Sequence, residues 1–492
     1  MKIDLLRKIP EHMDTVVVMM EEKGNLKNVE YLSDTLKDAI ATIVKHDEFV
    51  FSYAAIKSFQ VVPDHTRTNV ILCGLGEAAK LSMDKLRQLF ASCIRAAMKL
   101  SARQVYIFPG FSNPIGDVQF GHVLSEAALL AEYRFSKYLS SDKQHPIDSV
   151  HLALNLKNTR HINRGIVEGR IYAEATNLAR NLVNEPANVV TPEALAEAAK
   201  KAALQYGFSI EIFTLDKLKR IKMDAFLAVG RGAKHEPRLI IMKYLGNPDQ
   251  KHKVVGLVGK GLTYDSGGYC LKTPQGMVNM KNDMAGSAAV IGTFAAIATL
   301  KLKVNVVGVI AACENMISGD AYRTGDILRS MAGKTIEVIN TDAEGRLTLI
   351  DAITYAITKE HVDRIIDIAT LTGAAVGALG NQISAVVTND DKWLEKLKTA
   401  AESSGEKIWQ LPAHEEYKEL IKSEIADLKN TGGPYAGTIT AALFIREFVE
   451  DKPWIHIDIA GTALRDKESG VYSFGATGVG VRLLTSMLKE ME

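Results

Sequence analysis

The sequence is poor in cysteine, and the cysteines that it has form no pattern. Four occur among 492 residues, Cys73, Cys93, Cys270 and Cys313, and none belongs to a CxxC pair. A disulfide framework or a zinc knuckle needs closely spaced cysteines, so neither kind of site is indicated. Four widely spaced thiols are typical of buried cysteines in a protein from a reducing compartment.

The sequence also lacks an excess of charge of one sign, a secretion signal and a membrane span. The formal net charge is +1, so no strong overall field attracts nucleic acid or an anionic membrane. The segment MKIDLLRKIPEHMDTVVVMMEEKG has neither the basic-then-apolar layout nor the small-residue cleavage site of a signal peptide. We find no uninterrupted apolar run of about eighteen residues. We therefore expect a cytoplasmic protein with no membrane segment.

Several short motifs that would indicate a reaction class are incomplete. No HExxH is present, and the twelve histidines show no spacing typical of metal ligands. Lys260 is followed by glycine rather than serine or threonine, which argues against a phosphate loop. Ser266 lacks the first glycine of a nucleophile elbow, because Tyr264 stands in its place. The stretch Gly74–Ala79 lacks the third glycine of a dinucleotide turn, so we interpret it as an ordinary strand-to-helix turn.

The length and composition predict more than one globular domain. A chain of 492 residues is too long for one ordinary core and predicts two or three domains. Residues 1–157 alternate strand-like and helix-like stretches. Strands are predicted at Val16–Met20, Val70–Cys73 and Val105–Phe108, and a helix with one apolar face at Ser82–Leu100. We interpret this region as a small N-terminal α/β domain of macro-like layout.

A polar, helix-prone stretch at residues 158–183 is predicted to be a helical connector, and residues 184–492 a larger domain. Thr191-Pro192-Glu193 is typical of a helix start. Beyond it, runs of β-branched apolar residues predict strands buried on both faces, with helices between them. The strands are expected at Val254–Val258, Val304–Ala311, Ile365–Ala369 and Ile455–Ile459, and the helices at Gly286–Leu300, Leu347–Thr358 and Thr438–Glu450. We therefore predict an α/β/α catalytic domain around a mixed sheet, with its ligand site beyond the carboxyl ends of the strands.

Carboxylates gather in the segments between these elements. NTDAEGRL, residues 340–347, carries Asp342 and Glu344 two positions apart, so on an extended chain both would face the same side. Two adjacent carboxylates repel each other and favour a compensating cation. Taken alone, the segment is explained equally well as the capped, acidic first turn of a helix.

Two further segments strengthen the case for a metal site. GKGLTYDSGG, residues 259–268, contains Lys260 and Asp265, and MKND, residues 280–283, ends in Asp283. With Asp342 and Glu344 these residues supply four carboxylates, whose charge balances two divalent cations. Oxygen-rich ligands around two cations about 3.5–4 Å apart form the two-metal hydrolase arrangement. Lys260 can add a nitrogen ligand only after it loses its proton, which metal binding makes feasible.

At these residues the sequence resembles the leucyl aminopeptidase family, the M17 cytosol aminopeptidases. NTDAEGRL matches the signature octapeptide of that family without a substitution, and GKGLTYDSGGYCLK and MVNMKNDMAGSAAV match its ligand segments. The similarity continues through IDIATLTGA, ADLKNTGGPYAGTITAALFIREFV, WIHIDIAGTA and GATGVGVRLL. It covers residues 184–484, whereas the N-terminal third matches only in layout. Small departures at Tyr264, Thr273 and Ala285 remove no ligand and concern substrate preference.

The resemblance implies a role for each matching position. Lys260, Asp265, Asp283 and Glu344 would hold the tighter metal, and Asp265, Asp342 and Glu344 the more exchangeable one. The family's two catalytic positions match Lys272 and Arg346. Its apolar substrate pocket matches Met280, Thr370, Gly373 and Ala460, with backbone contacts to the peptide from Leu371.

The implied reaction is hydrolysis of the first peptide bond of a short peptide, with a preference for leucine and other apolar N-terminal residues. Two cations lower the pKa of a water, and Lys272 stabilises the tetrahedral oxyanion. In this family a bicarbonate held by Arg346 is thought to move the proton, and an arginine offers a suitable bidentate fork. Ordinary alternatives are a core role for Met280 and a salt bridge to neighbouring acids for Arg346.

Two functions compete with this interpretation. One is a dipeptidase of narrow substrate specificity, such as a cysteinyl-glycine dipeptidase. The other is a DNA-binding or structural role, against which the near-zero net charge argues. The resemblance also implies a homohexamer. Zinc, manganese, magnesium and cobalt all suit the ligand set, so the sequence does not select the metal.

Overall fold

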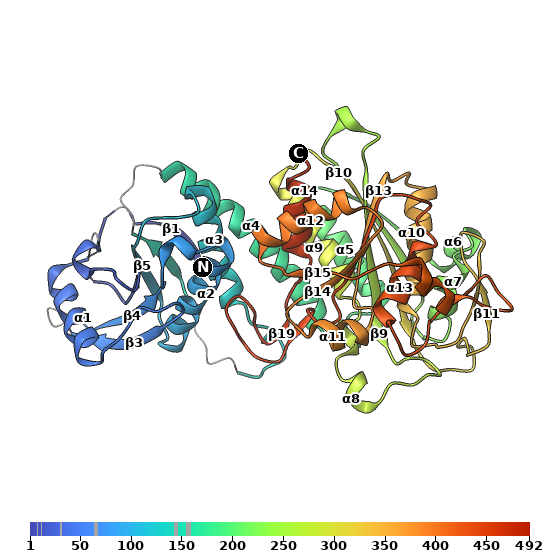
Figure 1. The fold of residues 1–492 in the computed structure, drawn as a ribbon, viewed down its shortest axis with the longest axis horizontal. Helices are drawn as coiled ribbons and strands as arrows, with labels where there is room; N and C mark the ends of the chain where they lie inside the picture. The colour runs from blue at the N-terminus through green and yellow to red at the C-terminus, as the bar shows by residue number, and fades with distance from the viewer. Residues whose placement is uncertain (7, 11, 30–31, 63–66, 142–145, 154–158) are drawn as a thin grey trace. The chain divides into compact units, whose positions relative to one another are not determined.

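The computed structural model describes the chain except at positions 7, 11, 30–31, 63–66, 142–145 and 154–158 (Figure 1). It divides into two compact units. The first comprises Met1–Glu174 and Lys467–Phe474, and the second comprises Ala175–Asp466 and Gly475–Glu492. The 26-residue helix α4, Thr159–Asn184, contributes residues to both units.

The N-terminal unit is built on a six-stranded sheet in the order β1-β6-β5-β2-β4-β3. All neighbouring strands are parallel except β3, which runs antiparallel to β4 at one edge. The strands are β1 (Lys2–Leu5), β2 (Thr15–Met20), β3 (Ile56–Val61), β4 (Thr68–Gly74), β5 (Gln104–Gly110) and β6 (Ser149–Leu152), and the helices are α1 (Asp34–His46), α2 (Met83–Lys99) and α3 (Asp117–Glu132). The strands and the helix predicted for this region are confirmed.

Helix α2 illustrates why the N-terminal prediction succeeds. Ser82 caps the helix by accepting a hydrogen bond from the backbone N–H of Lys85 at 3.3 Å. The apolar side chains at helical spacing all lie in the core, namely Leu86, Leu89, Phe90, Cys93, Ile94 and Ala97.

The second unit contains the region predicted to be the catalytic domain and is called the catalytic unit below. It is built on an eight-stranded mixed sheet in the order β15-β14-β17-β13-β9-β10-β8-β7. Its centre, β17-β13-β9-β10, is parallel, and β14, β8 and β7 run antiparallel to their inner neighbours. The strands are β7 (Ser209–Phe213), β8 (Arg238–Leu245), β9 (Val255–Asp265), β10 (Asn305–Asn315), β13 (Arg364–Ala369), β14 (Ser384–Thr388), β15 (Ile408–Gln410) and β17 (Trp454–Asp458). The predicted α/β class with a mixed catalytic sheet is confirmed.

Helices cover both faces of this sheet. Gly259 on β9 lies against α9, and the next residue, Lys260, lies against the first turn of α10, so these two helices are on opposite faces. The remaining helices are α5 (Pro192–Tyr206), α6 (Leu215–Arg220), α7 (Asp224–Gly230), α8 (Pro274–Met277), α9 (Ala285–Leu300), α10 (Gly345–Thr358), α11 (Gly373–Leu379), α12 (Asp391–Ser404), α13 (Gly437–Arg446) and α14 (Val481–Lys489).

Short elements complete the unit at its loops. A three-stranded sheet joins β11 (Ile327–Arg329), β12 (Thr335–Glu337) and β16 (Leu428–Lys429), and β18 (Leu464–Arg465) pairs with β19 (Gly475–Ala476). The segment before NTDAEGRL therefore belongs partly to this small sheet and not to the main one. Helix α10 is buried almost all round rather than amphipathic, because other helices pack on the side that faces away from the sheet.

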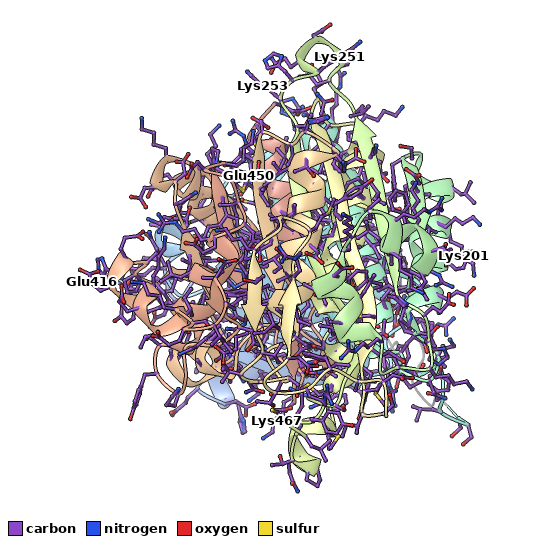
Figure 2. The ribbon with its side chains drawn as sticks, turned by 90° about the vertical axis from the view of Figure 1, so that its right-hand side faces the viewer. Lys201, Lys251, Lys253, Glu416, Glu450 and Lys467 are labelled. Carbon is purple, nitrogen blue, oxygen red and sulfur yellow. The ribbon has the colours of Figure 1, made fainter. Side chains whose placement is uncertain are left out.

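Helix α9 belongs to an apolar stretch of the described chain. Residues Pro274–Leu300 are long and apolar enough to cross a membrane by length and composition alone, but 89% of the most apolar window is buried inside the unit. A core helix passes the same test, so the finding is weak evidence for a membrane span. Exposed charges of both signs, such as Lys201 and Glu416, cover the surface in keeping with the small net charge (Figure 2).

Candidate metal centre

Lys260 and Asp265 both lie on β9, where the sequence predicted a loop. They are five positions apart, and in a regular strand an odd separation puts two side chains on opposite faces. The pairing with β10 is irregular between Cys313 and Glu314, because the partner on β9 moves from Leu262 to Tyr264. This bulge adds one residue to β9 and reverses the alternation beyond it, so both side chains face the same site.

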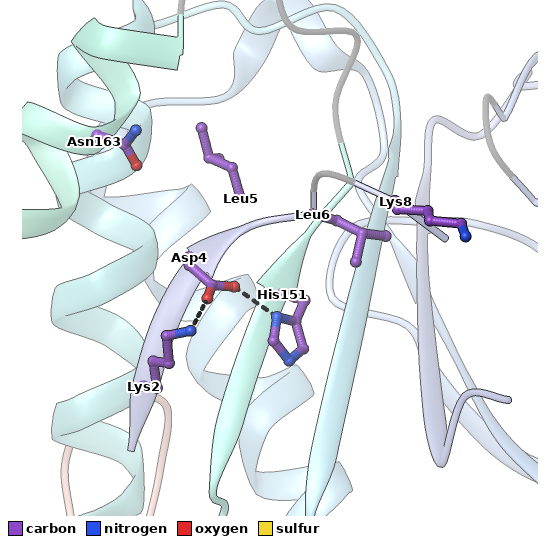
Figure 3. Close-up of a pocket in the computed structure, with 7 residues that line it drawn as sticks. All are labelled: Lys2, Asp4, Leu5, Leu6, Lys8, His151 and Asn163. Atoms are coloured by element: carbon purple, nitrogen blue, oxygen red, sulfur yellow. Dashed lines mark hydrogen bonds and ion pairs between the residues drawn. The ribbon is translucent and has the colours of Figure 1, made fainter. Parts of the chain in front are cut away.

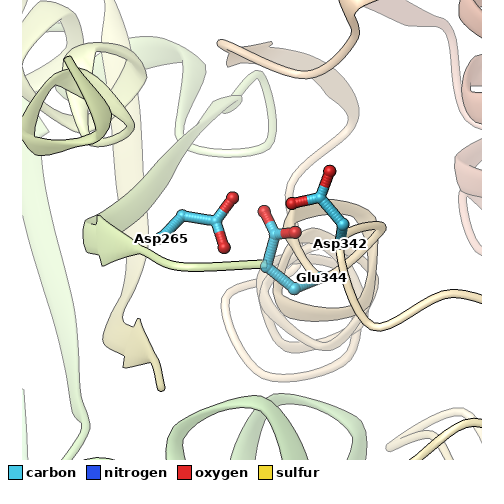
Figure 4. A group of neighbouring side chains, drawn as sticks. All are labelled: Asp265, Asp342 and Glu344. Atoms are coloured by element: carbon cyan, nitrogen blue, oxygen red, sulfur yellow. The ribbon is translucent and has the colours of Figure 1, made fainter. Parts of the chain in front are cut away.

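Three carboxylates converge at the carboxyl end of β9. One oxygen from each of Asp265, Asp342 and Glu344 lies within 4.8 Å of the others, a spacing that suits a shared cation (Figure 4). Asp342 lies in a turn and Glu344 has helical backbone angles at the start of α10. The extended chain assumed for this segment is therefore wrong, although its two carboxylates do lie together. Glu344 makes no side-chain capping bond, which disfavours the helix-cap explanation.

Two lysines lie among these acids. The Nζ atom of Lys260 is 2.8 Å from Asp283 and 2.9 Å from Glu344, and it donates to the carbonyl of Thr370 at 2.9 Å. The Nζ atom of Lys272 lies 2.8 Å from Asp265 and 2.6 Å from Asp342. Burial disfavours the charged form of each lysine, but the surrounding carboxylates outweigh it and raise the pKa of both.

The cluster holds more negative than positive charge. Four carboxylates face two ammonium groups, and Asp265, Asp283 and Glu344 are each less than 5% exposed. Burial, together with repulsion from Asp265, raises the pKa of Asp283, Asp342 and Glu344. Raised pKa values on several neighbouring acids are the electrostatic signature of a site that lacks compensating positive charge.

The donor set fits divalent cations. The buried Oε2 atom of Glu344 accepts no hydrogen bond from any described residue, so it is available as a ligand. Carboxylate oxygens with one nitrogen suit zinc, manganese, magnesium and cobalt. The amine of Lys260 can join them only as the neutral form, and a bound dication favours release of that proton.

Arg346, the second residue of α10, is buried with only part of its guanidinium bonded. Its Nη1 donates to the carbonyl of Asn430 at 2.9 Å, whereas its Nε has no partner among the described residues. Burial lowers the pKa of Arg346 to about 10. The ion pairs of the described residues include none between Arg346 and the neighbouring acids, so its free donor is better matched to a small anion.

Polar residues that the sequence did not single out hold the ligand segments in place. Asn315, at the end of β10, donates through Nδ2 to Asp265 at 2.8 Å and to the carbonyl of Thr341 at 3.0 Å. Tyr322 donates to that same carbonyl at 2.6 Å. The only sequence signal for Asn315 is its position at the carboxyl end of a predicted central strand.

The residues expected to line a substrate pocket lie on segments next to the cluster. Thr370 is buried, and its hydroxyl donates to Asp283 at 2.8 Å. Leu371 and Ala460 are half-buried, and Gly373 is exposed at the start of α11. Met280 is half-buried in a short 3-10 turn, Met280–Asn282, just before Asp283.

Comparison with known proteins shows the family to which the chain belongs. The model of the "Cytosol aminopeptidase family, catalytic domain" matches residues 177–485, and that of the N-terminal domain of the family matches residues 16–142. The chain belongs to the cytosol aminopeptidase family. Membership of the cytosol aminopeptidases makes it a metal-dependent aminopeptidase, a hydrolase of peptides.

Relatives of this cytosol aminopeptidase match over nearly the whole chain. A "Probable cytosol aminopeptidase" of Clostridium perfringens is 46% identical and covers 95% of each chain. Another of Alkaliphilus oremlandii is 48% identical over 86% of this chain and 85% of its own. Among solved structures, the "Bottromycin maturation enzyme BotP in complex with Mn" has a TM-score of 0.87 at 32% identity, covering 97% of this chain and 99% of its own.

The N-terminal unit has a cavity of its own, and its charges are arranged differently. A hollow of about 610 Å³ is lined by residues around β1 and β6 (Figure 3). There the carboxylate of Asp4 lies 2.7 Å from the Nζ atom of Lys2 and 2.6 Å from the Nδ1 atom of His151. A lysine and an imidazole bond this acid, and Asp4 is the one carboxylate among the described lining residues, so this hollow does not have the surplus of carboxylates found in the catalytic unit.

Proposed function

We propose that this cytosol aminopeptidase uses two divalent cations to hydrolyse the first peptide bond of short peptides, with a preference for leucine and other apolar N-terminal residues. The observation that carries the proposal is the buried surplus of carboxylates around Asp265, where the pKa of three acids is raised. Such a cluster becomes stable at neutral pH once dications neutralise it.

The ligands are assigned by family position and are supported by the distances given above. Lys260, Asp265, Asp283 and Glu344 would hold one cation, and Asp265, Asp342 and Glu344 the other. Manganese or zinc suits this set, and the manganese complex of BotP favours manganese. When bound, the pair would lower the pKa of a water toward neutrality and polarise the scissile carbonyl.

Two residues of the chain would act on the reacting atoms. Lys272 lies beside Asp265 and Asp342 and keeps its charge, so its ammonium can stabilise the oxyanion of the tetrahedral intermediate. Arg346 keeps an unpaired Nε donor and would clamp a bicarbonate that carries the proton. The segments bearing Met280, Thr370, Gly373 and Ala460 would receive the apolar side chain, and Leu371 the peptide backbone.

Metal removal combined with a blocked substrate tests this proposal. We expect leucyl p-nitroanilide to be hydrolysed, dialysis against a chelator to abolish turnover, and added Mn²⁺ or Zn²⁺ to restore it. N-acetyl-leucyl p-nitroanilide should resist cleavage, because its amine can no longer bind. Asp342→Asn should not be rescued by metal, whereas Asp320→Asn, at an exposed acid outside the cluster, should behave as the wild type. Full turnover by metal-free enzyme would refute the mechanism.

The role given to Arg346 needs a separate test. We expect bicarbonate added to carbonate-free buffer to raise kcat of the wild type, because the anion completes the proton path. Arg346→Lys retains the charge but loses the bidentate fork, so its response to bicarbonate should be reduced. An equal response in both proteins would argue for a purely structural arginine.

A further inference from the structure

Asp458 is a buried carboxylate whose contacts join two separate loops of the catalytic unit. It is the last residue of β17 and is 1% exposed. Its Oδ1 accepts the backbone N–H of Leu371 and that of Ala460, each at 3.1 Å. Its Oδ2 accepts the hydroxyl of Thr372 at 2.6 Å. One side chain therefore fixes the segment after β13 against the turn after β17.

Thr372 extends this connection to two helices. Its hydroxyl oxygen accepts the backbone N–H of Ala375 at 3.1 Å, which caps the first turn of α11. It also lies 2.7 Å from the hydroxyl of Thr438, near the start of α13. The orientation of the exposed helix α11 is thus tied, through one hydroxyl, to the buried carboxylate of Asp458.

The same segment reaches the metal ligands. Thr370, two residues before Thr372, accepts a hydrogen bond from Lys260 through its carbonyl and donates one to Asp283 through its hydroxyl. A shift of the Leu371–Thr372 segment would therefore change the distance between the substrate-binding loops and the cluster. Movements of about 1 Å near reacting groups are enough to alter rates by about 10²-fold.

A carboxylate suits this position better than an amide does. All three bonded neighbours of Asp458 donate hydrogen bonds, and an asparagine offers one oxygen and one donor group in place of two acceptors. The next acid on the same face, Asp367 of β13, is also buried, but it bonds His456 and Trp454, at 2.6 Å each, and holds no loop. Asp367 thus provides a matched carboxylate with no contact to the substrate segments.

We infer that Asp458 is a positioning residue that determines substrate selectivity, because it fixes Leu371, in the segment that links Thr370 to Gly373, relative to Ala460, and these are segments proposed above to receive the N-terminal residue. This inference rests on the function proposed above. Without the carboxylate, the two loops are free to separate, and the pocket loses the fixed width that distinguishes a leucyl from an alanyl side chain.

The test compares kcat/KM for leucyl and alanyl p-nitroanilide in Asp458→Ala, Thr372→Val, Thr372→Ser and Asp367→Ala. In a fixed apolar pocket one methylene is worth about 10–200-fold, so we expect the leucyl preference to fall by about tenfold in the first two variants. Thr372→Ser retains the hydroxyl and should keep the wild-type ratio. Asp367→Ala loses an equally buried acid and should lower stability without changing the ratio.

The ratio separates selectivity from simple destabilisation, because partial unfolding reduces activity toward both substrates equally. An unchanged ratio in Asp458→Ala and Thr372→Val that still bind the full complement of metal would overturn the inference. An equal change in Asp367→Ala would do the same. If the metal-loaded wild type cleaves neither anilide, the proposed function fails instead, so the two failures are distinguishable. Should Asp458→Ala not fold, the pair of Thr372 variants decides alone.

Discussion

The two units bury charged clusters of similar size, but the clusters are balanced differently. In the N-terminal unit, Arg87 lies 2.9 Å from Glu126, and His122 lies 3.2 Å from Glu126 and 3.1 Å from Glu168. Burial opposes a charge on His122, yet the two glutamates outweigh it and raise the pKa of the imidazole. In the catalytic unit, four carboxylates form ion pairs with two cations among the described residues, Lys260 and Lys272.

This difference separates a cluster that supports structure from one that binds a ligand. In the N-terminal cluster, Arg87 and His122 lie against Glu126 and Glu168, so these two acids are compensated by cations of the chain itself. The catalytic cluster places a surplus of negative charge in a buried site, which raises the pKa of its acids and requires added cations at neutral pH. Charge balance, rather than burial alone, therefore identifies the site.

Neutralising one acid of the surplus should have the largest effect. In Glu344→Gln we expect kcat/KM for leucyl p-nitroanilide to fall by more than about 10²-fold, since even outer partners of metal ligands are worth about 10–100-fold in affinity or activity. The thermal stability of the metal-free protein should not fall, because a repelling charge is removed. Steady-state kinetics measures the change in kcat/KM, and calorimetry after chelation measures the thermal stability of the metal-free protein. A marked loss of stability would contradict a surplus of negative charge in the cluster.

Neutralising an acid of the N-terminal cluster should lower stability and leave activity unchanged. Glu126→Gln leaves Arg87 and His122 buried without their shared acid, and breaking a buried ion pair costs about 3–5 kcal/mol. Far-UV circular dichroism should detect an earlier denaturant transition. Fluorescence of the three tryptophans, Trp393, Trp409 and Trp454, reports the catalytic unit alone and should keep its midpoint. A fall in kcat of the folded enzyme would show that this cluster is not merely structural.

The smallest effect should be a dependence of stability on pH through His456. Burial opposes its charge, but Asp367 outweighs that effect, so the pKa of His456 is raised above its value in the unfolded chain. Its contribution is fully present below about pH 6.5 and is lost as the pH rises through the folded-state pKa. The melting temperature of the wild type should therefore fall more between pH 6 and pH 9 than that of His456→Gln. Calorimetry that gives the same fall in melting temperature for the two proteins would contradict this contribution of His456.

The sequence predicts the central strands of the catalytic unit and the carboxylates of its site. Strands such as Ile365–Ala369 are recognisable because burial on both faces demands continuous apolar residues. The four carboxylates are found because they lie in short, unbroken segments. Of the four, Asp265 alone ends a central parallel strand, so the common edge of these strands explains its position and not that of the other three. The structure brings them together with Lys260 and Lys272.

Residues that act through distant contacts were not predictable in the same way. Asn315 and Asp458 matter because of hydrogen bonds to residues far away in the sequence, and neither stands in a motif whose chemistry is evident from spacing. The bulge in β9 leaves no periodic signal, because glycines interrupt the alternation at Gly259 and Gly261. Such features depend on which strands become neighbours, and local patterns do not encode that.

The extra residue in β9 makes the centre depend on an irregularity of the backbone and not only on side-chain identity. If β9 lost its bulge with no change of sequence, Lys260 and Asp265 would be an odd five positions apart in a regular strand, and Asp265 would turn to the opposite face of the sheet. The bulge in β9 is therefore as necessary for the metal site as the carboxylates are.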